Sequence, residues 1–361
     1  MNAAPDSRKR QHIADLLAGY LGIFGNKTGW LSYHFAYRTP FGSHLLNALA
    51  ECEMRVPGLG QRFIQDLAAV KYVPSKQSDE GWKARFEELI QKFSEILVAR
   101  ALCHIDWPDG TRIEFEPLNS TNGKLPEFSV TTPDRIWLFE VKCPSFITHQ
   151  ESRAANAHQL PIRSFLRNAP HLEGQTVTLP RDNTLKDFLA SAQEKFEGFG
   201  DGEITGILIV IWDTRMYEAI GVLCHPEAGL LTAKTWLTAD GAPRTFPDVS
   251  GAIIINRLEQ LKLGAQERVD HLNPFELGGP DALPSTWCPN LGVGDLDPLV
   301  ASGFDAFHFE GTAMAAEYSM MDYVLWFEAP SSIARHDRGR RRRRPLLHDL
   351  NGGTSHLAYG G

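Results

Sequence analysis

The sequence predicts an α/β protein in which a mixed sheet is flanked by helices, with a helical subdomain at the N-terminus. Two continuous apolar runs, 206–212 and 251–256, are typical of strands that are buried on both faces. A third run of β-branched and aromatic residues, 136–141, follows a Pro-Asp pair, which indicates a strand leaving a tight turn. Helical periodicity dominates the first hundred residues. Strands followed by helices favour a layered α/β domain.

Composition places the chain among ordinary globular proteins. It has 361 residues, 43% of them hydrophobic and 22% charged, so it can bury a large core. No stretch approaches the ~20 apolar residues of a membrane span, and the polar N-terminus lacks a signal-peptide core. Its five cysteines are scattered without a C-x-x-C pair. We therefore expect reduced thiols, a cytoplasmic location and no contact with a membrane.

Charge is distributed unevenly along the chain. Residues 335–361 hold seven Arg and two Asp, so the net charge of −8 leaves −13 for the other 334 residues. The totals therefore give no sign of a broad basic surface for nucleic acid, although a local basic groove is compatible with them. The run 340–344 could bind phosphates, serve as an address signal or have no function. We expect a disordered Arg-rich tail over 331–361.

Four helices are predicted before the first strand. Apolar spacing predicts helices over 11–24, 43–55 and 60–70, which we assign to an N-terminal subdomain, 1–76. The longest helix is expected over about 80–102, with Ser78-Asp79 at its N-terminus. The second domain would then cover 77–330.

The long helix carries several glutamates around its apolar stripe. Glu87 borders the stripe, whereas Glu88 and Glu95 are expected to point away from it into solvent. After this helix, Asp109-Gly110 predicts a hairpin turn between short strands at 102–107 and 111–116.

The most informative stretch is the hairpin over 126–142. If its turn centres between Pro133 and Asp134, positions whose numbers add to 267 face each other, and Glu127 lies opposite Glu140. Lys142 projects from the same face as Glu140, because side chains alternate along a strand. Two facing carboxylates repel each other unless a cation lies between them. The alternative is an ion pair between Glu140 and Lys142 on a solvated strand face.

The remaining elements follow this hairpin. Thr148 and Glu151 have the spacing of a capping box for a helix ending near Leu160, which would carry Gln159. The strand at 251–256 should feed a short helix over 257–263, and Tyr323–Phe327 is expected to be the last strand.

The pattern Glu127…Glu140-x-Lys142 resembles the catalytic core of the PD-(D/E)xK nuclease superfamily, which has the restriction endonuclease-like fold. A helix before the hairpin, Pro126-Glu127 at its start and a helix after Lys142 extend the resemblance over about 80–260. It implies Mg²⁺ or Mn²⁺ held by Glu127, Glu140 and the carbonyl of Val141, with Lys142 as the catalytic lysine.

The resemblance implies two further candidate site residues, and the sequence departs from the family pattern at one position. Some members add a glutamate on the preceding helix and a glutamine on the following one, for which Glu87 and Gln159 are the nearest candidates. The family usually has Asp where this chain has Glu127. Asp134 cannot replace it, because six extended residues, roughly 20 Å, separate it from Glu140.

The resemblance implies a metal-dependent nuclease with DNA as the expected substrate and a role in prokaryotic defence or restriction. A homodimer, or a partner protein in a defence complex, would fit such a role. The main alternative is a degenerate member that binds nucleic acid or a protein without cleavage. An RNA-cleaving, toxin-like enzyme is a third hypothesis.

Overall fold

A seven-stranded mixed sheet lies at the centre of the structure, a computed structural model. The structure describes residues 4–24, 30–72, 81–156, 158–159, 177–178, 181–200, 202–213, 215–225, 229–266, 273–278 and 284–308. The strand order is β1-β2-β3-β6-β7-β8-β9, and a separate two-stranded sheet joins β4 and β5. The strands are β1 (Arg112–Phe115), β2 (Phe128–Thr131), β3 (Ile136–Lys142), β4 (His158–Gln159), β5 (Val177–Thr178), β6 (Ile204–Trp212), β7 (Gly251–Asn256), β8 (Ser285–Pro289) and β9 (Ala306–His308).

The three central strands run parallel. β3 pairs with β6, and β6 with β7, in parallel, whereas β1 and β2 continue the sheet as an antiparallel meander from β3. On the other side β8 is antiparallel to β7 and parallel to β9. β7 is buried along its whole length, as are the last seven residues of β6. The α/β class, the mixed sheet and these two apolar strands are therefore confirmed.

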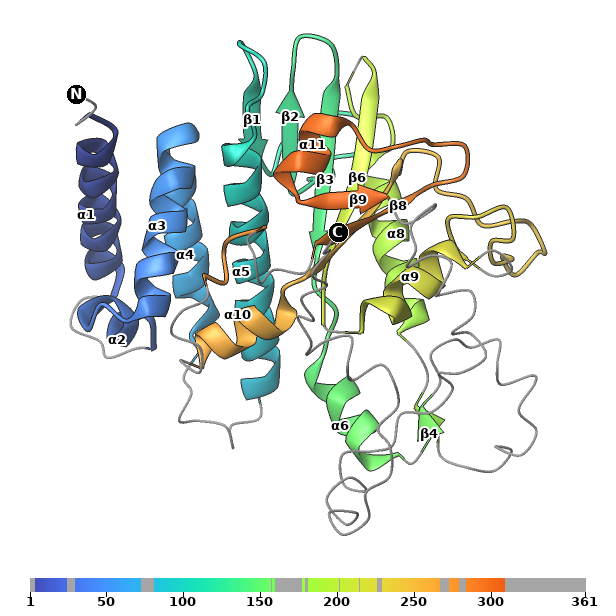
Figure 1. The fold of residues 1–361 in the computed structure, drawn as a ribbon, viewed down its shortest axis with the longest axis horizontal. Helices are drawn as coiled ribbons and strands as arrows, with labels where there is room; N and C mark the ends of the chain where they lie inside the picture. The colour runs from blue at the N-terminus through green and yellow to red at the C-terminus, as the bar shows by residue number, and fades with distance from the viewer. Residues whose placement is uncertain are drawn as a thin grey trace, which may run out of the picture.

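Helices cover both faces of the sheet (Figure 1). The long helix α5 packs on β3 on one face and also contacts α3, α4 and α10, while α8 and α9 pack on the opposite face. The helices are α1 (Ala4–Phe24), α2 (Trp30–Ala36), α3 (Pro40–Arg55), α4 (Leu59–Val70), α5 (Trp82–His104), α6 (Ile147–Ala155), α8 (Asp182–Phe196), α9 (Met216–Cys224), α10 (Leu258–Ala265) and α11 (Pro298–Gly303).

The N-terminal helices share a hydrophobic core with the sheet. Leu45 of α3, Phe63 of α4, Phe93 of α5 and Phe139 of β3 belong to one cluster of buried side chains. As a result, α5 is covered by helices on one side and by the sheet on the other. Residues 73–80, where the predicted domain boundary falls, lie outside the described part of the chain.

Some predicted elements differ from the structure. The strand expected at 102–107 was wrong, because α5 continues to His104, and β1 pairs with β2 instead of forming a hairpin across Asp109-Gly110. The capping box was also wrong: Phe146 is the N-cap residue of α6, without a side-chain cap. This helix ends at Ala155, so Gln159 lies in β4.

Several predictions fall on residues that the structure does not describe. Ser78-Asp79, Tyr323–Phe327 and the tail 331–361 all lie there. All five cysteines are free. Among the described residues, no helix combines the length and the apolar character needed to cross a bilayer.

We predict that Gly206→Ala destabilises the fold by roughly 1–3 kcal/mol, the usual cost of overpacking a core. Gly206 lies in β6, and a methyl group there would collide with the Asp248 carbonyl oxygen and the Phe196 ring. Urea denaturation measures the loss. Gly294→Ala is the matched control, because a methyl group there meets no atom within 4 Å. Equal stability of both variants would contradict the prediction.

Candidate functional site

The register of the β2–β3 hairpin agrees with the prediction. Phe128 pairs with Phe139, and the residue numbers of every pair in this ladder add to 267. Glu127 lies in a bend directly before β2, and continuing the register by one residue would bring it opposite Glu140. Pro133 and Asp134 lie exposed in the turn. The site is therefore at the carboxyl end of β3, where the antiparallel β2 begins.

Alternation along β3 determines which helix each side chain faces. Phe139 and Val141 join the core beneath α5, whereas Leu138 joins the opposite core with α8 and α9. Glu140 and Lys142 follow Leu138 at a period of two, so they point towards the α8 side. Glu140 has 0% exposure, which excludes a solvated strand face for this carboxylate.

Two lysines neutralise the Glu140 carboxylate. The Lys142 ammonium lies 2.6 Å from its Oε1. The ammonium of Lys195, in the last turn of α8, donates to both oxygens, at 2.7 Å from Oε1 and 2.9 Å from Oε2. Sequence reasoning did not identify Lys195, because its contact with Glu140 joins residues 55 positions apart.

Glu127 differs from Glu140 in having no such partner. Its Oε1 is buried without a hydrogen bond, and no ion pair of its carboxylate occurs among the described residues. Burial, followed by repulsion from the carboxylates of Glu95 and Glu140, raises the pKa of Glu127 to about 9. At neutral pH this group therefore holds a proton unless a cation lies beside it.

Glu95 is a second missed residue, and its predicted exposure was wrong. Its exposed fraction is only 3%, because α5 is covered on two sides and buries more than one stripe. Lys92 donates to Glu95 at 2.6 Å and Gln91 at 3.1 Å. Burial lowers the pKa of Lys92, but the Glu95 carboxylate outweighs it and the net pKa is raised. The lysine three residues before Glu95 was the one signal in the sequence.

The carbonyl of Val141 already has a partner. Gln91 donates its Nε2 to this oxygen at 3.2 Å and accepts from the Cys143 amide at 2.8 Å, so it bridges α5 to the end of β3. A carbonyl oxygen has two lone pairs, and one is still available to a ligand.

Of the two tentative positions, Glu87 is bonded at a different place from this cluster. Glu87 accepts hydrogen bonds from the Ser145 hydroxyl and from the amides of Phe146 and Ile147, each at 2.9 Å, at the start of α6. Its carboxylate therefore acts as a cap for α6. Gln159 lies in β4, where it pairs with Thr178. A metal-binding role for either residue stays a prediction.

The loop before Glu127 holds the C-terminal end of α8. Asn119, which is buried, donates to the carbonyls of Lys195 and Glu197 at 3.1 and 3.0 Å. Asn122 donates to the carbonyls of Glu194 and Glu197. These amides satisfy carbonyls that a helix terminus leaves free. The same loop thus fixes the backbone of Lys195 and leads directly into Glu127.

A second buried charge cluster lies at the carboxyl end of β6. One nitrogen of Arg181 donates to Asp213 and Glu218, both at 2.9 Å, and its guanidinium lies 4.0 Å from the centre of the Trp212 ring. Burial, followed by the charge of Arg181, lowers the pKa of the nearby His149 to about 3. The contacts of Arg181 join the start of α8 to the end of β6 and to α9, and His149 of α6 lies 3.8 Å from Glu218.

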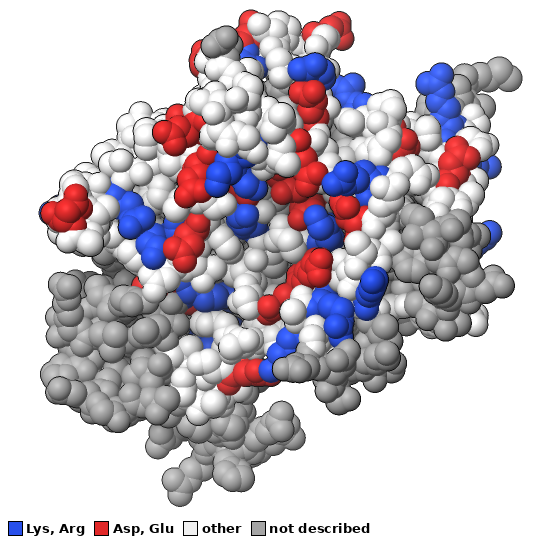
Figure 2. Space-filling view, turned by 180° about the vertical axis from the view of Figure 1, so that it is seen from behind, with Lys and Arg blue, Asp and Glu red and all other residues white. Residues whose placement is uncertain are grey.

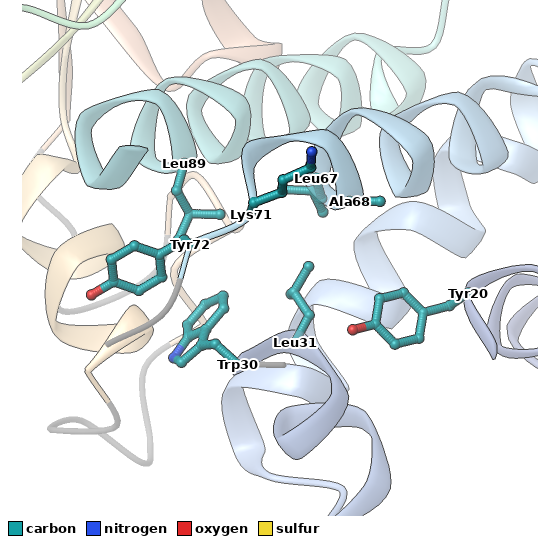
Figure 3. A pocket seen from close by; sticks show the side chains of 8 residues that line it. All are labelled: Tyr20, Trp30, Leu31, Leu67, Ala68, Lys71, Tyr72 and Leu89. Atoms are coloured by element: carbon teal, nitrogen blue, oxygen red, sulfur yellow. The ribbon is translucent and has the colours of Figure 1, made fainter. Parts of the chain in front are cut away.

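A small, open apolar pocket lies among the N-terminal helices (Figure 3). Tyr20, Trp30 and Tyr72 line it, and Lys71 is the one charged side chain at its wall. No carboxylate contributes to it, so it is separate from the Glu127–Glu140 site.

Comparisons with known proteins give no family for this chain: no family model matches it, and no curated protein or solved structure matches it significantly. The fit of a metal ion must therefore be judged from the residues. Within the described part of the chain, no group of three or more His, Cys, Asp or Glu is arranged as a metal centre. Mg²⁺, however, is commonly held by one or two carboxylates and several waters. The unpartnered Oε1 of Glu127, opposite Glu140, fits such an ion.

We predict that Glu127→Gln stabilises the protein above pH 5. The folded-state pKa of about 9 exceeds the usual 4.5, so Glu127 contributes full stability below pH 4.5 and loses it as the pH rises towards 9. Glutamine has no such titration. At pH 8 the variant should be more stable by roughly 2–4 kcal/mol, and at pH 4 the difference should vanish.

Chemical denaturation at both pH values measures this difference. The exposed Glu88→Gln serves as control and should change stability at neither pH. A Glu127→Gln variant less stable than the wild type at pH 8 would show that Glu127 is satisfied as an anion.

We predict that Glu87→Ala lowers stability by about 1–2 kcal/mol, because the amides of Phe146 and Ile147 lose their acceptor. Thermal melting with and without Mn²⁺ checks its role. If Glu87 acts only as the cap of α6, the stabilisation by Mn²⁺ is the same as in the wild type. Its loss in Glu87→Ala, but not in the exposed Glu88→Ala, would instead assign Glu87 to the metal site.

Proposed function

We propose that this protein is a divalent-metal-dependent nuclease with a restriction endonuclease-like fold, which hydrolyses phosphodiester bonds in DNA. One observation carries the proposal: Glu127 has a buried, unpartnered carboxylate oxygen, and the register of the hairpin brings this residue towards Glu140, which contacts Lys142. A carboxylate oxygen that is buried without a partner costs stability even in a half-buried residue such as Glu127, so its presence favours a ligand.

The order of elements supports the fold assignment. The helix α5 precedes the β2–β3 hairpin, β3 carries the Glu140-Val141-Lys142 tripeptide, and α6 follows directly. These are the pieces on which the resemblance to the PD-(D/E)xK superfamily depends. An open α/β sheet commonly binds ligands at the carboxyl ends of its parallel strands, which is where Glu140 and Lys142 lie.

Glu127, Glu140 and the Val141 carbonyl would hold Mg²⁺ or Mn²⁺ in this proposal. Such an ion polarises a phosphate and acidifies a water when bound. The side chain of Lys142 is 25% exposed, so it could contact a substrate that approaches from solvent. It would orient the attacking water and stabilise negative charge on the phosphate. Because Lys92 and Glu95 are bonded to each other, their two charges would hold constant positions near Glu127.

The role in defence or restriction follows only from the resemblance, whereas the cytoplasmic location is inferred from the scattered cysteines and the polar N-terminus. We propose a cytoplasmic enzyme of prokaryotic defence or restriction that acts as a homodimer or with a partner protein. An enzyme with two-fold symmetry suits the cleavage of both strands of a DNA duplex.

A second candidate function is binding without cleavage. Both oxygens of Glu140 are already bonded to ammonium groups, which favours an inactive charge cluster. On the face seen in Figure 2, basic and acidic side chains are interspersed over the described residues without a broad basic patch. Weak electrostatic attraction would limit nonspecific binding of DNA.

We predict that the wild-type protein nicks or linearises supercoiled plasmid in Mg²⁺ or Mn²⁺ and not in EDTA. Lys142→Ala and Glu140→Gln should each lower the rate by at least ~100-fold, as expected for loss of proton transfer or of a metal ligand. Gel electrophoresis over time measures the rates. Lys124→Ala is the control, because Lys124 pairs with the exposed side chain of Glu194.

Equal cutting by Lys142→Ala, or no cutting at high protein concentration, would contradict the nuclease proposal. Binding of plasmid without cutting would then support the second function. Parallel RNA and DNA substrates decide between a deoxyribonuclease and an RNA-cleaving enzyme.

A further inference from the structure

Lys195 occupies an unusual place for a lysine. It lies in the last turn of α8, yet its side chain is only 22% exposed and points towards the buried Glu140. Its backbone carbonyl accepts from Asn119, so the loop that leads into Glu127 fixes its position. A lysine on a helix surface usually stays in water. The local structure here holds Lys195 at the sheet instead.

The contact between Lys195 and Glu140 uses both carboxylate oxygens. Its ammonium lies 2.7 and 2.9 Å from them, whereas Lys142 contacts Oε1 alone, at 2.6 Å. A divalent cation coordinated by Glu140 needs at least one of these oxygens, and two cations repel each other strongly where water is excluded. When the cation is bound, Lys142 can still contact one oxygen of Glu140, but Lys195 can no longer bond to both.

Glu127 makes this position attractive to a cation of higher charge. Its Oε1 is buried without a hydrogen bond, so the ammonium groups of Lys142 and Lys195, which lie on Glu140, leave this oxygen without a partner. A divalent ion offers two positive charges and can bond to oxygens of both residues at once. The arrangement therefore resembles a cation site occupied by a side chain of the protein itself.

We propose that Lys195 is a positioning residue that occupies the cation position of the Glu127–Glu140 pair, and that a divalent cation binds by displacing its ammonium. The inference rests on the metal site of the proposed function and deepens it. Without the ion, Lys195 keeps the buried Glu140 paired and the fold stable. With the ion bound, Lys195 is released towards the solvent edge of the site.

Lys195→Met tests this exchange, because methionine keeps much of the side-chain volume and removes the charge. Without metal the variant should melt several degrees below the wild type, since Glu140 loses one of its two partners. Its affinity for Mn²⁺, measured from the electron paramagnetic resonance signal of the free ion, should rise by about tenfold or more, because no ammonium competes.

Lys186→Met is the matched control on the same helix. Lys186 pairs with the exposed Asp187 nine residues before Lys195, so its loss should leave Mn²⁺ affinity unchanged. Lys195→Arg keeps the charge if the methionine variant does not fold. The guanidinium is expected to hold both oxygens of Glu140 as a fork and to weaken Mn²⁺ binding.

Mn²⁺ affinity in Lys195→Met equal to or below that of the wild type would overturn the exchange, as would tighter binding in Lys195→Arg. Cleavage of plasmid by the wild type together with either result would reject this inference alone. Tighter Mn²⁺ binding by Lys195→Met without any cleavage by the wild type would support the exchange and reject the nuclease. Absence of Mn²⁺ binding in every variant would reject both.

Discussion

Glu140 is a carboxylate buried in the middle of a sheet, and its neutralisation constrains the elements around it. Removing such an anion from water costs several kcal/mol unless ion partners lie beside it. Lys142 comes from the same strand, but Lys195 must be brought by α8. The last turn of α8 must therefore pack close enough to β3 for the Lys195 side chain to reach Glu140, and Asn119 and the loop around it hold this turn in place. One buried charge thus connects a strand, a helix and a loop that are distant in sequence.

The acids of the site differ in whether their carboxylates have charged partners. Glu95 is paired with Lys92, and Glu140 with Lys142 and Lys195, while Glu127 between them has an oxygen without a partner. Proteins tolerate such a group mainly where a ligand supplies what is missing, and there they give up stability for binding. The unpartnered oxygen of Glu127 is therefore both a cost to stability and the observation on which the proposed function rests.

Sequence reasoning succeeded where the signal is local. The apolar runs predicted β6 and β7, and the turn at Pro133-Asp134 predicted the register of the hairpin. It failed where a neighbour distant in sequence decided the outcome. The strand expected at 102–107 is the end of α5, because packing against other helices and the sheet extends the helix beyond its intrinsic preference. Glu95 was expected in solvent, but the N-terminal helices cover the second side of α5.

The sequence by itself determined the register that brings Glu127 towards Glu140, and it determined that Lys142 lies on the same side of the sheet as Glu140. Pairing across a short turn and alternation along a strand involve only near neighbours. The tertiary structure alone decided which charges meet these groups. Lys195 and Glu95 reach the site from helices on opposite faces of the sheet, and their positions depend on how whole layers pack. The acids of the hairpin could be found by counting residues; the lysine that competes for one of them could be found only in three dimensions.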